Sequence, residues 1–282
     1  MPKGNERNIW KPRRRIEQSF ANEMIDLMGT QFFPHVRTWF PSLTFTEFDI
    51  DAFALNIARR MVQGVSIQNA RSWRQAALQA GSQRIYRALQ TEMQGPVAQE
   101  ARRLIRENAA LIRSLPNDLA LSTSRFVASQ QRKGLRSEEI AEMLAARVPI
   151  LARNRIHLIA RTETAKAETA FSQARAENLG IRWYEWVTAK DQRVRVSHQK
   201  MNEVLVAWSN QPSPEQLVHE KSTLGHYAPG GCPNCRCVAI PLVRLDEVSW
   251  PHRVYVRDQI VWMNRVDFAR IAGLPSVTRR AA

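Results

Sequence analysis

Three cysteines crowd into one short segment, Cys-Pro-Asn-Cys-Arg-Cys at residues 232–237. Thiolates at this C-x-x-C-x-C spacing can converge on one tetrahedral zinc ion, with a histidine as the fourth ligand. His198 is the leading candidate for that histidine, and His219 and His226 in the intervening stretch are its rivals. A site with four protein ligands leaves no open position for water, so we expect such a zinc ion to close a loop rather than to catalyse a reaction. The predicted metal ligands are His198, Cys232, Cys235 and Cys237.

The same cysteines can instead be free structural thiols. A bridge between Cys235 and Cys237 would be strained, whereas Cys232 can pair with either of them after exposure to air. Three clustered cysteines make no disulfide framework in a chain of 282 residues, and the opening residues contain no apolar stretch suited to a signal peptide. We therefore expect a reducing compartment and a cytoplasmic site of synthesis, with zinc as the candidate structural cofactor.

A second group of residues carries opposite charges. On an extended strand, Asp191, Arg193 and Arg195 would share one face, whereas Arg161 and Glu163 lie about 200° apart on a helix, so at most one of them reaches the strand. An arginine can hold a carboxylate with two hydrogen bonds, which favours a polar clamp between helix and sheet over acid–base catalysis, because no nucleophile is indicated. The candidate clamp residues are Arg161, Glu163, Asp191, Arg193, Arg195 and Arg236.

Positive charge exceeds negative charge along the whole chain. The sequence has 41 Lys and Arg against 26 Asp and Glu, a net charge of +15, and the excess is densest in the first fifteen residues. Such a field attracts nucleic acid or acidic protein surfaces without specifying either, although a basic soluble surface is the simpler interpretation. The candidate DNA-binding residues form a basic arm of Lys11, Arg13, Arg14 and Arg15.

Two types of secondary structure must position these residues. Residues 46–178 read as helical, since apolar residues recur every three or four positions. Breaks are expected at Gly64, at Gly95 with Pro96, at Pro116, at Gly134 and at Pro149. After Gly180, β-branched and aromatic runs predict strands, and residues 208–231 predict a long loop with room for a short helix. We expect an α+β protein in which a helical N-terminal region is followed by a long helix packed on a small, mainly antiparallel sheet.

Four divisions of the chain follow from these patterns. Residues 1–45 form the basic arm and leading segment, and residues 46–148 form a helical domain suited to docking. Residues 149–243 form a domain that holds the charged and cysteine motifs, and residues 244–282 form an extension and tail. No run of about 18 apolar residues exists, so we expect no membrane partner.

The order of four motifs is more specific than any one of them. A-R-T-E-T at residues 160–164, a Gly-to-Trp strand at 180–186, D-Q-R-V-R-V-S-H at 191–198 and N-C-R-C at 234–237 follow one another. This string resembles the phage Mu F-like, or phage head-morphogenesis, family. Family members commonly have a glycine soon after the third motif, where this chain has Met-Asn-Glu at 201–203.

The resemblance implies a minor structural protein inside the head of a tailed phage, without catalytic activity. It implies association with the portal protein, and with a scaffold or major capsid protein, during head assembly and DNA packaging or ejection. The location implied is the virion, and the host cytoplasm during assembly. Two other interpretations stay open: a metal-dependent hydrolase or nuclease using His198, Glu163 and the cysteines, and a stand-alone module that binds double-stranded DNA.

Overall fold

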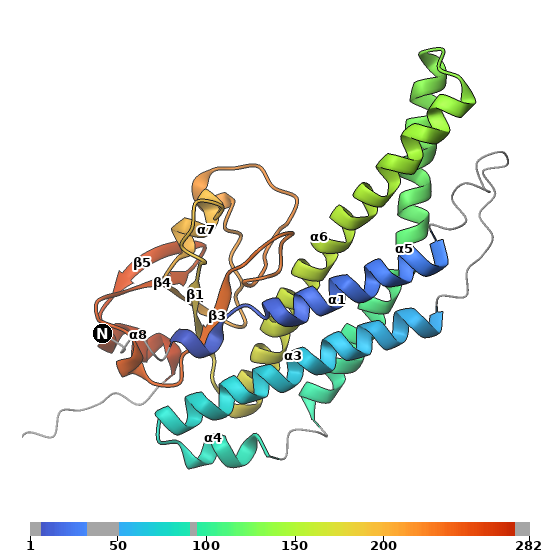
Figure 1. Cartoon of the computed structure of the whole chain (residues 1–282). Coiled ribbons are helices and arrows are strands. Elements are labelled where there is room, and N and C mark those ends of the chain that lie inside the picture. Colours follow the sequence, from blue (N-terminus) through green and yellow to red (C-terminus); the bar gives the residue numbers. More distant parts are fainter. Residues whose placement is uncertain (1–6, 33–50, 91–94, 274–282) are drawn as a thin grey trace, which may run out of the picture. The chain divides into compact units, whose positions relative to one another are not determined.

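Long helices make up most of the N-terminal two thirds of the protein (Figure 1). The structure is a computed structural model and describes residues 7–32, 51–90 and 95–273. The long helices are α1 (Arg14–Leu27), α3 (Asp51–Gln79), α5 (Pro96–Arg132) and α6 (Ser137–Leu179). Shorter helices are α4 (Gln83–Ala88), α7 (Val196–Met201) and α8 (Arg265–Ala272), with single turns at η1 (Arg7–Trp10), η2 (Met28–Phe32), η4 (Gln216–Val218) and η5 (Leu245–Glu247).

The described residues divide into two compact units. The helical unit comprises residues within Arg14–Val65 and Ala101–Thr164, and the sheet unit comprises residues within Met1–Arg13, Ser66–Glu100 and Ala165–Ala282. Helices α3, α5 and α6 contribute residues to both units. The residues of the predicted Arg161–Glu163 pair therefore belong to the helical unit, whereas the cysteines and His198 belong to the sheet unit.

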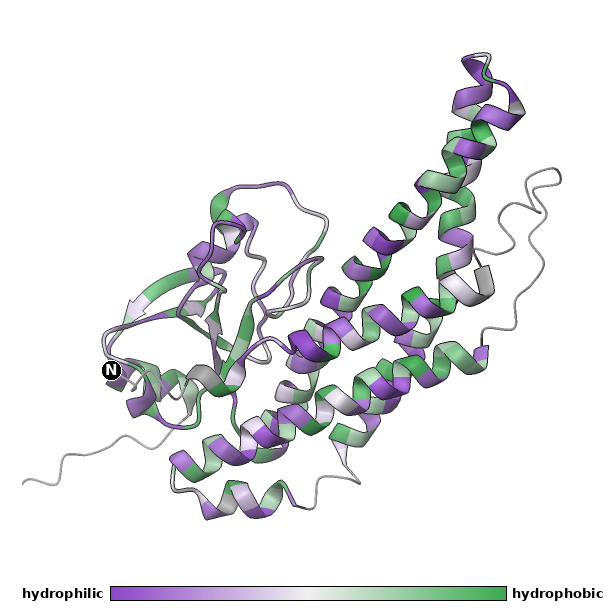
Figure 2. Ribbon diagram, in the orientation of Figure 1, coloured by the Kyte–Doolittle hydropathy of each residue, from purple (hydrophilic) through white to green (hydrophobic). Residues whose placement is uncertain are grey.

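The helical unit is held together by apolar faces at helical spacing. Figure 2 shows apolar and polar residues intermixed along each long helix, as expected of helices with one face in a core. Its largest wholly buried side chains include Phe20 and Met24 of α1 and Leu104, Ile112 and Leu115 of α5. Burying each such side chain stabilises the fold by about 1.5–3 kcal/mol, so this core outweighs the exposed ion pairs around it.

Three predicted helix breaks are wrong, because α3 runs through Gly64, α5 through Pro116 and α6 through Pro149. A proline inside a helix costs about 3 kcal/mol, because it removes a hydrogen bond and its ring meets the preceding turn. Leu115 flanks the first proline and Val148 flanks the second, and both side chains are buried. Burial of the residue before each proline thus helps to offset its local cost. The predicted break at Gly134 is confirmed, since α5 ends before it and the glycine has a φ of +81°.

The sheet has five strands in the order β3-β1-β2-β4-β5. They are β1 (Trp183–Val187), β2 (Val204–Ala207), β3 (Val238–Pro241), β4 (His252–Val256) and β5 (Gln259–Met263). Three of the neighbouring pairs are antiparallel, and β2 pairs with β4 in parallel. The α+β class and the long helix followed by a small, mainly antiparallel sheet are therefore confirmed.

Alternate residues of the strands serve two separate cores. Trp186, Val204 and Val206 lie in one buried cluster that also holds the three cysteines and Trp73 of α3. Leu205 on the opposite face packs in a second cluster with Phe268 of α8. This two-residue period is what a sheet covered on both faces requires. Among the described residues, no helix has the length and hydropathy that crossing a bilayer demands.

A candidate cysteine and histidine centre

The first two cysteines lie at the ends of a tight turn. The backbone N–H of Cys235 donates to the carbonyl of Cys232 at 3.2 Å, Pro233 follows the first cysteine, and Asn234 has a φ of +59°. A type II turn typically has proline at its second position and a residue in the left-handed backbone conformation at its third. Asparagine tolerates that conformation better than most residues. The turn therefore folds Cys232 back toward Cys235.

The segment before this turn is fastened to helix α6. Gly230 has a φ of +84°, and a Cβ built on it would lie 2.8 Å from the carbonyl oxygen of Ala165. The Thr169 hydroxyl donates to the carbonyl of Pro229 at 2.6 Å, and the N–H of Gly230 donates to the sulfur of Cys235 at 3.3 Å. Only glycine fits here without moving backbone.

Helix α7 supplies His198, whose ring is 2% exposed and stands edge-on to Trp186 at 5.4 Å between ring centres. Its Nδ1 lies 3.6 Å from the sulfur of Cys235 and 3.4 Å from that of Cys237. Its Nε2 lies 3.6 Å from the sulfur of Cys232. The structure thus brings the four predicted ligands together, and all three cysteines are buried and unbridged.

Hydrogen bonding among the sulfurs separates their acidities. The thiols of Cys232 and Cys237 donate to Cys235 and hold the pKa of Cys235 well below its ordinary value. Hydrogen bonding to Cys235 and burial raise the pKa of the other two thiols. Arg195 adds a positive charge, since its Nη1 donates to the sulfur of Cys232 at 3.0 Å and its Nη2 to the carbonyl of Pro233 at 2.9 Å.

A second layer of polar groups surrounds His198. Its Nε2 lies 2.9 Å from the hydroxyl oxygen of Tyr227, and that hydroxyl donates to Oε1 of Glu215 at 2.6 Å. The Ser197 hydroxyl also donates to Oε1 of Glu215, at 3.3 Å. Burial and the bond to Glu215 raise the pKa of Tyr227 far above its ordinary value, so the phenol keeps its proton.

Sequence reasoning missed Tyr227 and Glu215. Each lies in the long loop between β2 and β3, far in sequence from His198, and no fixed spacing connects them. The hollow beside the cluster has a volume of only about 20 Å³, room for a water molecule or an ion and not for an organic substrate.

The rival histidines do not join the cluster. His219 and His226 are both exposed, and Nδ1 of His226 bonds the carbonyl of Gln211 at 2.8 Å. The group of possible metal ligands that the described residues form is His198, Cys235 and Cys237, with ligand atoms within 4.8 Å of one another. The structure therefore favours His198 over its rivals.

The predicted strand around Asp191 is wrong. Residues 191–195 form a turn and the lead into α7, because the Asp191 side chain accepts from the backbone N–H of Arg193 at 3.0 Å and caps the turn. Asp191 nevertheless meets Arg236 through both carboxylate oxygens, with Nη2 to Oδ1 at 2.7 Å and Nη1 on Oδ2. This ion pair lowers the pKa of Asp191 to about 2. It ties one loop to another rather than a helix to the sheet.

The other predicted clamp residues have different surroundings. Arg161 donates to Glu17 of α1 at 3.2 Å within the helical unit, and Glu163 is buried in the same unit. Arg193 is exposed, and Arg195 contacts the cysteine turn. Of the six candidates, the described contacts join Asp191 with Arg236, and they place Arg195 against the thiols.

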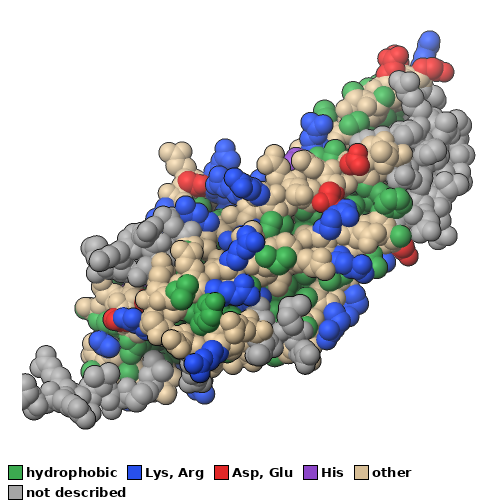
Figure 3. Space-filling model, turned by 60° about the horizontal axis from the view of Figure 1, so that its bottom comes forward, with side chains coloured by type: hydrophobic (Ala, Val, Ile, Leu, Met, Phe, Trp, Pro, Cys, Tyr) green, Lys and Arg blue, Asp and Glu red, His purple; other side chains and the backbone are tan. Residues whose placement is uncertain are grey.

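The basic arm is divided by the structure. Lys11, Arg14 and Arg15 are exposed, but Arg13 donates to Glu168 through Nε at 2.9 Å and through Nη2 at 2.6 Å. The Arg13 and Glu168 side chains are 11% and 10% exposed. Arg13 is thus committed to the protein interior and not to DNA. Figure 3 shows the Lys and Arg side chains of one face spread over the surface rather than gathered in one patch.

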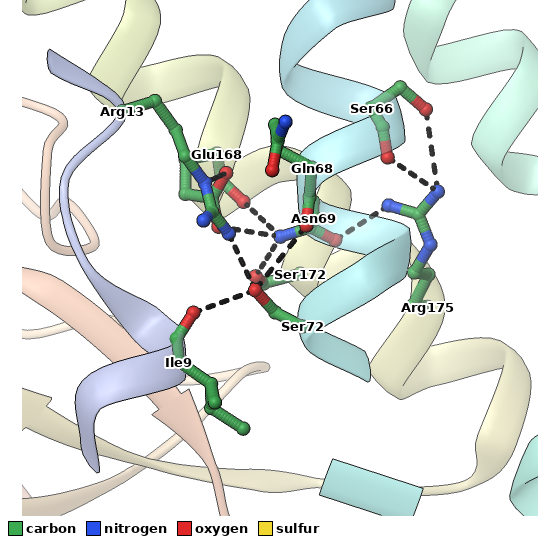
Figure 4. Close-up of polar contacts among 9 residues, drawn as sticks. All are labelled: Ile9, Arg13, Ser66, Gln68, Asn69, Ser72, Glu168, Ser172 and Arg175. Atoms are coloured by element: carbon green, nitrogen blue, oxygen red, sulfur yellow. Dashed lines mark hydrogen bonds and ion pairs between the residues drawn. The ribbon is translucent and has the colours of Figure 1, made fainter. Parts of the chain in front are cut away.

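Arg13 belongs to a buried polar network that the sequence did not predict (Figure 4). Asn69 of α3 donates to Glu168 at 2.9 Å and to Ser172 at 2.8 Å, and its own oxygen accepts from Arg175 at 2.6 Å. Ser72 accepts from Arg13 and donates to the carbonyl of Ile9. The sequence offered one signal for this network, polar residues three or four positions apart on a helix: Asn69 with Ser72, and Glu168 with Ser172 and Arg175. Polar residues on exposed helix surfaces show the same spacing, so the signal does not indicate burial.

Comparison with known proteins supports the resemblance. Residues 126–240 match the family described as "Phage Mu protein F like protein", a range that contains all four sequence motifs. The chain is 28% identical over 154 residues to an "Uncharacterized protein" of Haemophilus influenzae, covering 54% of this chain and 31% of that protein. The chain thus spans about a third of the length of this curated relative. No solved structure matches. The region 126–240 is therefore Mu F-like, and the predicted resemblance is confirmed.

The turn at residues 201–203, where family members commonly have a glycine, is stabilised in another way in this chain. Glu203, just before β2, has a φ of +59°, the left-handed conformation that glycine adopts most easily. The side-chain oxygen of Asn202 accepts from the N–H of Thr188 at 3.1 Å and from its hydroxyl at 2.9 Å. These bonds stabilise the turn without a glycine.

Proposed function

We propose that this protein is a minor structural protein of a tailed-phage head, present inside the capsid and in contact with the portal protein. The observation that carries the proposal is the Mu F-like match over residues 126–240, which includes α6, the sheet strands β1 to β3 and the cysteine segment. Phage head morphogenesis is the role that this family implies. Its site of action is accordingly the virion, or the host cytoplasm during assembly.

The centre supports a structural role rather than a catalytic one. His198 and the cysteines are buried, both ring nitrogens of His198 face protein groups, and the adjoining hollow admits no organic substrate. A general acid or base must reach its substrate within hydrogen-bonding distance. These groups are better placed to hold the β1–α7 and β2–β3 loops than to act on a bound molecule.

The helical unit offers surfaces for an assembly partner such as the portal, scaffold or major capsid protein. Leu121 of α5 and Ile150 of α6 are 59% and 61% exposed, and Phe53 of α3 is 51% exposed. Apolar side chains on one face of a helix can dock into a hydrophobic groove of a partner. We assign the partner contact to this unit and DNA contact to the exposed cations of the arm.

The test follows incorporation of full-length variants into heads. Leu121→Glu and Ile150→Glu are expressed from a plasmid in cells infected with phage lacking the gene, and heads are purified before DNA packaging. Loss of the protein from these heads, and of its cross-links to portal protein, is the expected result. Leu224→Glu is the matched control, because Leu224 is 42% exposed on a loop of the sheet unit. Normal incorporation of both helical variants contradicts the docking assignment, and absence of the wild-type protein from heads contradicts the proposed function.

A further inference from the structure

We propose that His198, Cys232, Cys235 and Cys237 bind one Zn²⁺ ion, with His198 coordinating through Nδ1. The ion would join three segments of the sheet unit: helix α7, the turn at 232–235 and the start of β3. This inference concerns the sheet unit alone and does not depend on the role of the protein in the phage head.

The spacing of the ligand atoms matches a tetrahedral zinc site. Zinc binds nitrogen at about 2.0–2.1 Å and sulfur at about 2.3 Å, so two such ligands at tetrahedral corners lie about 3.5 Å apart. The Nδ1 atom of His198 lies 3.4 Å from the sulfur of Cys237 and 3.6 Å from that of Cys235. The two nitrogen–sulfur edges of the tetrahedron are therefore already near the required length, and the three ligand atoms lie within 4.8 Å of one another.

Cys232 supplies the fourth corner. The turn directs it toward the other sulfurs, and its thiol hydrogen-bonds to Cys235. Its sulfur lies beside Nε2 of His198 at 3.6 Å, so binding requires it to shift toward the Nδ1 side of the ring. The two middle residues of the turn, Pro233 and Asn234, are exposed and leave room for this shift, whereas Cys237 is held directly before β3.

The second layer sets the histidine tautomer that zinc needs. A carboxylate can only accept, and Oε1 of Glu215 accepts from both Tyr227 and Ser197. Since the Tyr227 proton points to Glu215, the Tyr227 oxygen accepts from Nε2–H of His198. The lone pair of His198 then lies on Nδ1, which faces two sulfurs. Ligating histidines almost always donate their other N–H to such a partner.

Charge balance also fits. Three thiolates and Zn²⁺ carry a net charge of −1, and a buried net charge requires a partner. Arg195 donates to the sulfur of Cys232 and supplies the compensating charge at the solvent side of the turn. Arg236, beside two of the ligands in sequence, is already committed to Asp191.

Metal content of the full chain is the first test. The protein is purified under reducing conditions without a histidine tag, and zinc is measured by elemental analysis. One zinc per chain is expected, with three sulfurs at about 2.3 Å and one nitrogen at about 2.0–2.1 Å in X-ray absorption. Zinc-free protein that also fails to bind added Zn²⁺ or Co²⁺ overturns the site. A zinc coordination shell in X-ray absorption that holds two sulfurs and an oxygen in place of the third sulfur overturns the assignment of Cys232.

Variants separate ligation from packing. His198→Gln is expected to abolish binding of Co²⁺, followed by its thiolate charge-transfer absorption, whereas the matched variant His219→Gln leaves it unchanged. Tyr227→Phe removes the acceptor for Nε2–H but keeps the ring, and a 10- to 100-fold weaker zinc affinity is expected in competition with a chromophoric chelator. An unchanged affinity in Tyr227→Phe, with its fold verified by circular dichroism, overturns the Nδ1 assignment even if His198→Gln fails to fold.

Discussion

Replacing Gly230 by alanine is expected to destabilise the sheet unit by about 2–4 kcal/mol. A non-glycine residue at positive φ costs about 1–2 kcal/mol. The added Cβ would also lie 2.8 Å from the Ala165 carbonyl oxygen, which is backbone of α6 and cannot rotate away. The loop must shift and strain its two anchors, the Thr169 bond to Pro229 and the Gly230 bond to Cys235, each worth about 0.5–1.5 kcal/mol.

Gly180→Ala is the matched control for this substitution. Gly180 also lies in the sheet unit with a positive φ, +73°, but nothing lies within 4 Å of a Cβ built there. This variant carries the conformational cost alone, about 1–2 kcal/mol. The difference between the two variants therefore measures the close approach of the loop to α6.

Urea denaturation followed by tryptophan fluorescence is a suitable assay. Seven of the eight tryptophans belong to the sheet unit: Trp10, Trp73, Trp183, Trp186, Trp208, Trp250 and Trp262. Trp39 lies outside the described residues, so all variants are made in a Trp39→Phe background, in which the signal reports the sheet unit. If the free energies of unfolding of Gly230→Ala and Gly180→Ala agree within about 0.5 kcal/mol, the usual uncertainty of such comparisons, the loop is not pressed against α6 and the reasoning fails.

Three further predictions concern charged groups. Glu168→Gln removes the negative charge that pairs with Arg13, and it should lower the free energy of unfolding by roughly 2–4 kcal/mol in urea denaturation. Lys190→Met, which removes an exposed ion pair, is the control, and an equal loss of stability in the two variants would contradict a buried network. Burial raises the pKa of Glu247 to about 7, so its ionisation opposes folding above pH 7, and this penalty disappears as the pH falls below the unfolded value near 4.5. Glu247→Gln should therefore be more stable than wild type at pH 8 and equally stable at pH 4, and a gain independent of pH would exclude titration as its cause. The third variant replaces the exposed cations of the arm, Lys11, Arg14 and Arg15, with glutamine. For binding to duplex DNA, the steepness of log affinity plotted against log salt concentration should fall by about 2.7, and an unchanged slope would place the DNA contact elsewhere.

The sequence was most informative where chemistry depends on short spacing. Cys232, Cys235 and Cys237 lie within six residues, and a turn is the simplest way to join them, so their convergence could be predicted. His198 followed because three cysteines leave the fourth position of a tetrahedral zinc site to another donor, and few histidines were available. Tyr227 and Glu215 could not be found this way, because their contact with His198 is made by the path of a long loop.

Predictions from periodicity failed where a side-chain hydrogen bond or core packing opposed them. Alternation at Asp191, Arg193 and Arg195 resembled a strand, but a side-chain hydrogen bond from Asp191 to the backbone favours a turn, and the chain then enters α7. Pro149 resembled a helix start, but buried Val148 and Ala152 on either side keep α6 continuous. A count of periodicity registers neither the side-chain bond that forms the turn at Asp191 nor the burial that keeps α6 continuous.

The network around Glu168 also sets an order of events during synthesis. Arg13 is made 155 residues before the glutamate that it pairs with. At translation rates of about 5–20 residues per second, roughly 8–30 s pass before that partner is added to the chain. Until then, the segment from Ile9 to Arg13 has no carboxylate at this position to bind. The N-terminal segment of the sheet unit therefore pairs with α6 only after more than half of the chain has been made, and until then Arg13 is as available to other acidic surfaces as the exposed cations beside it.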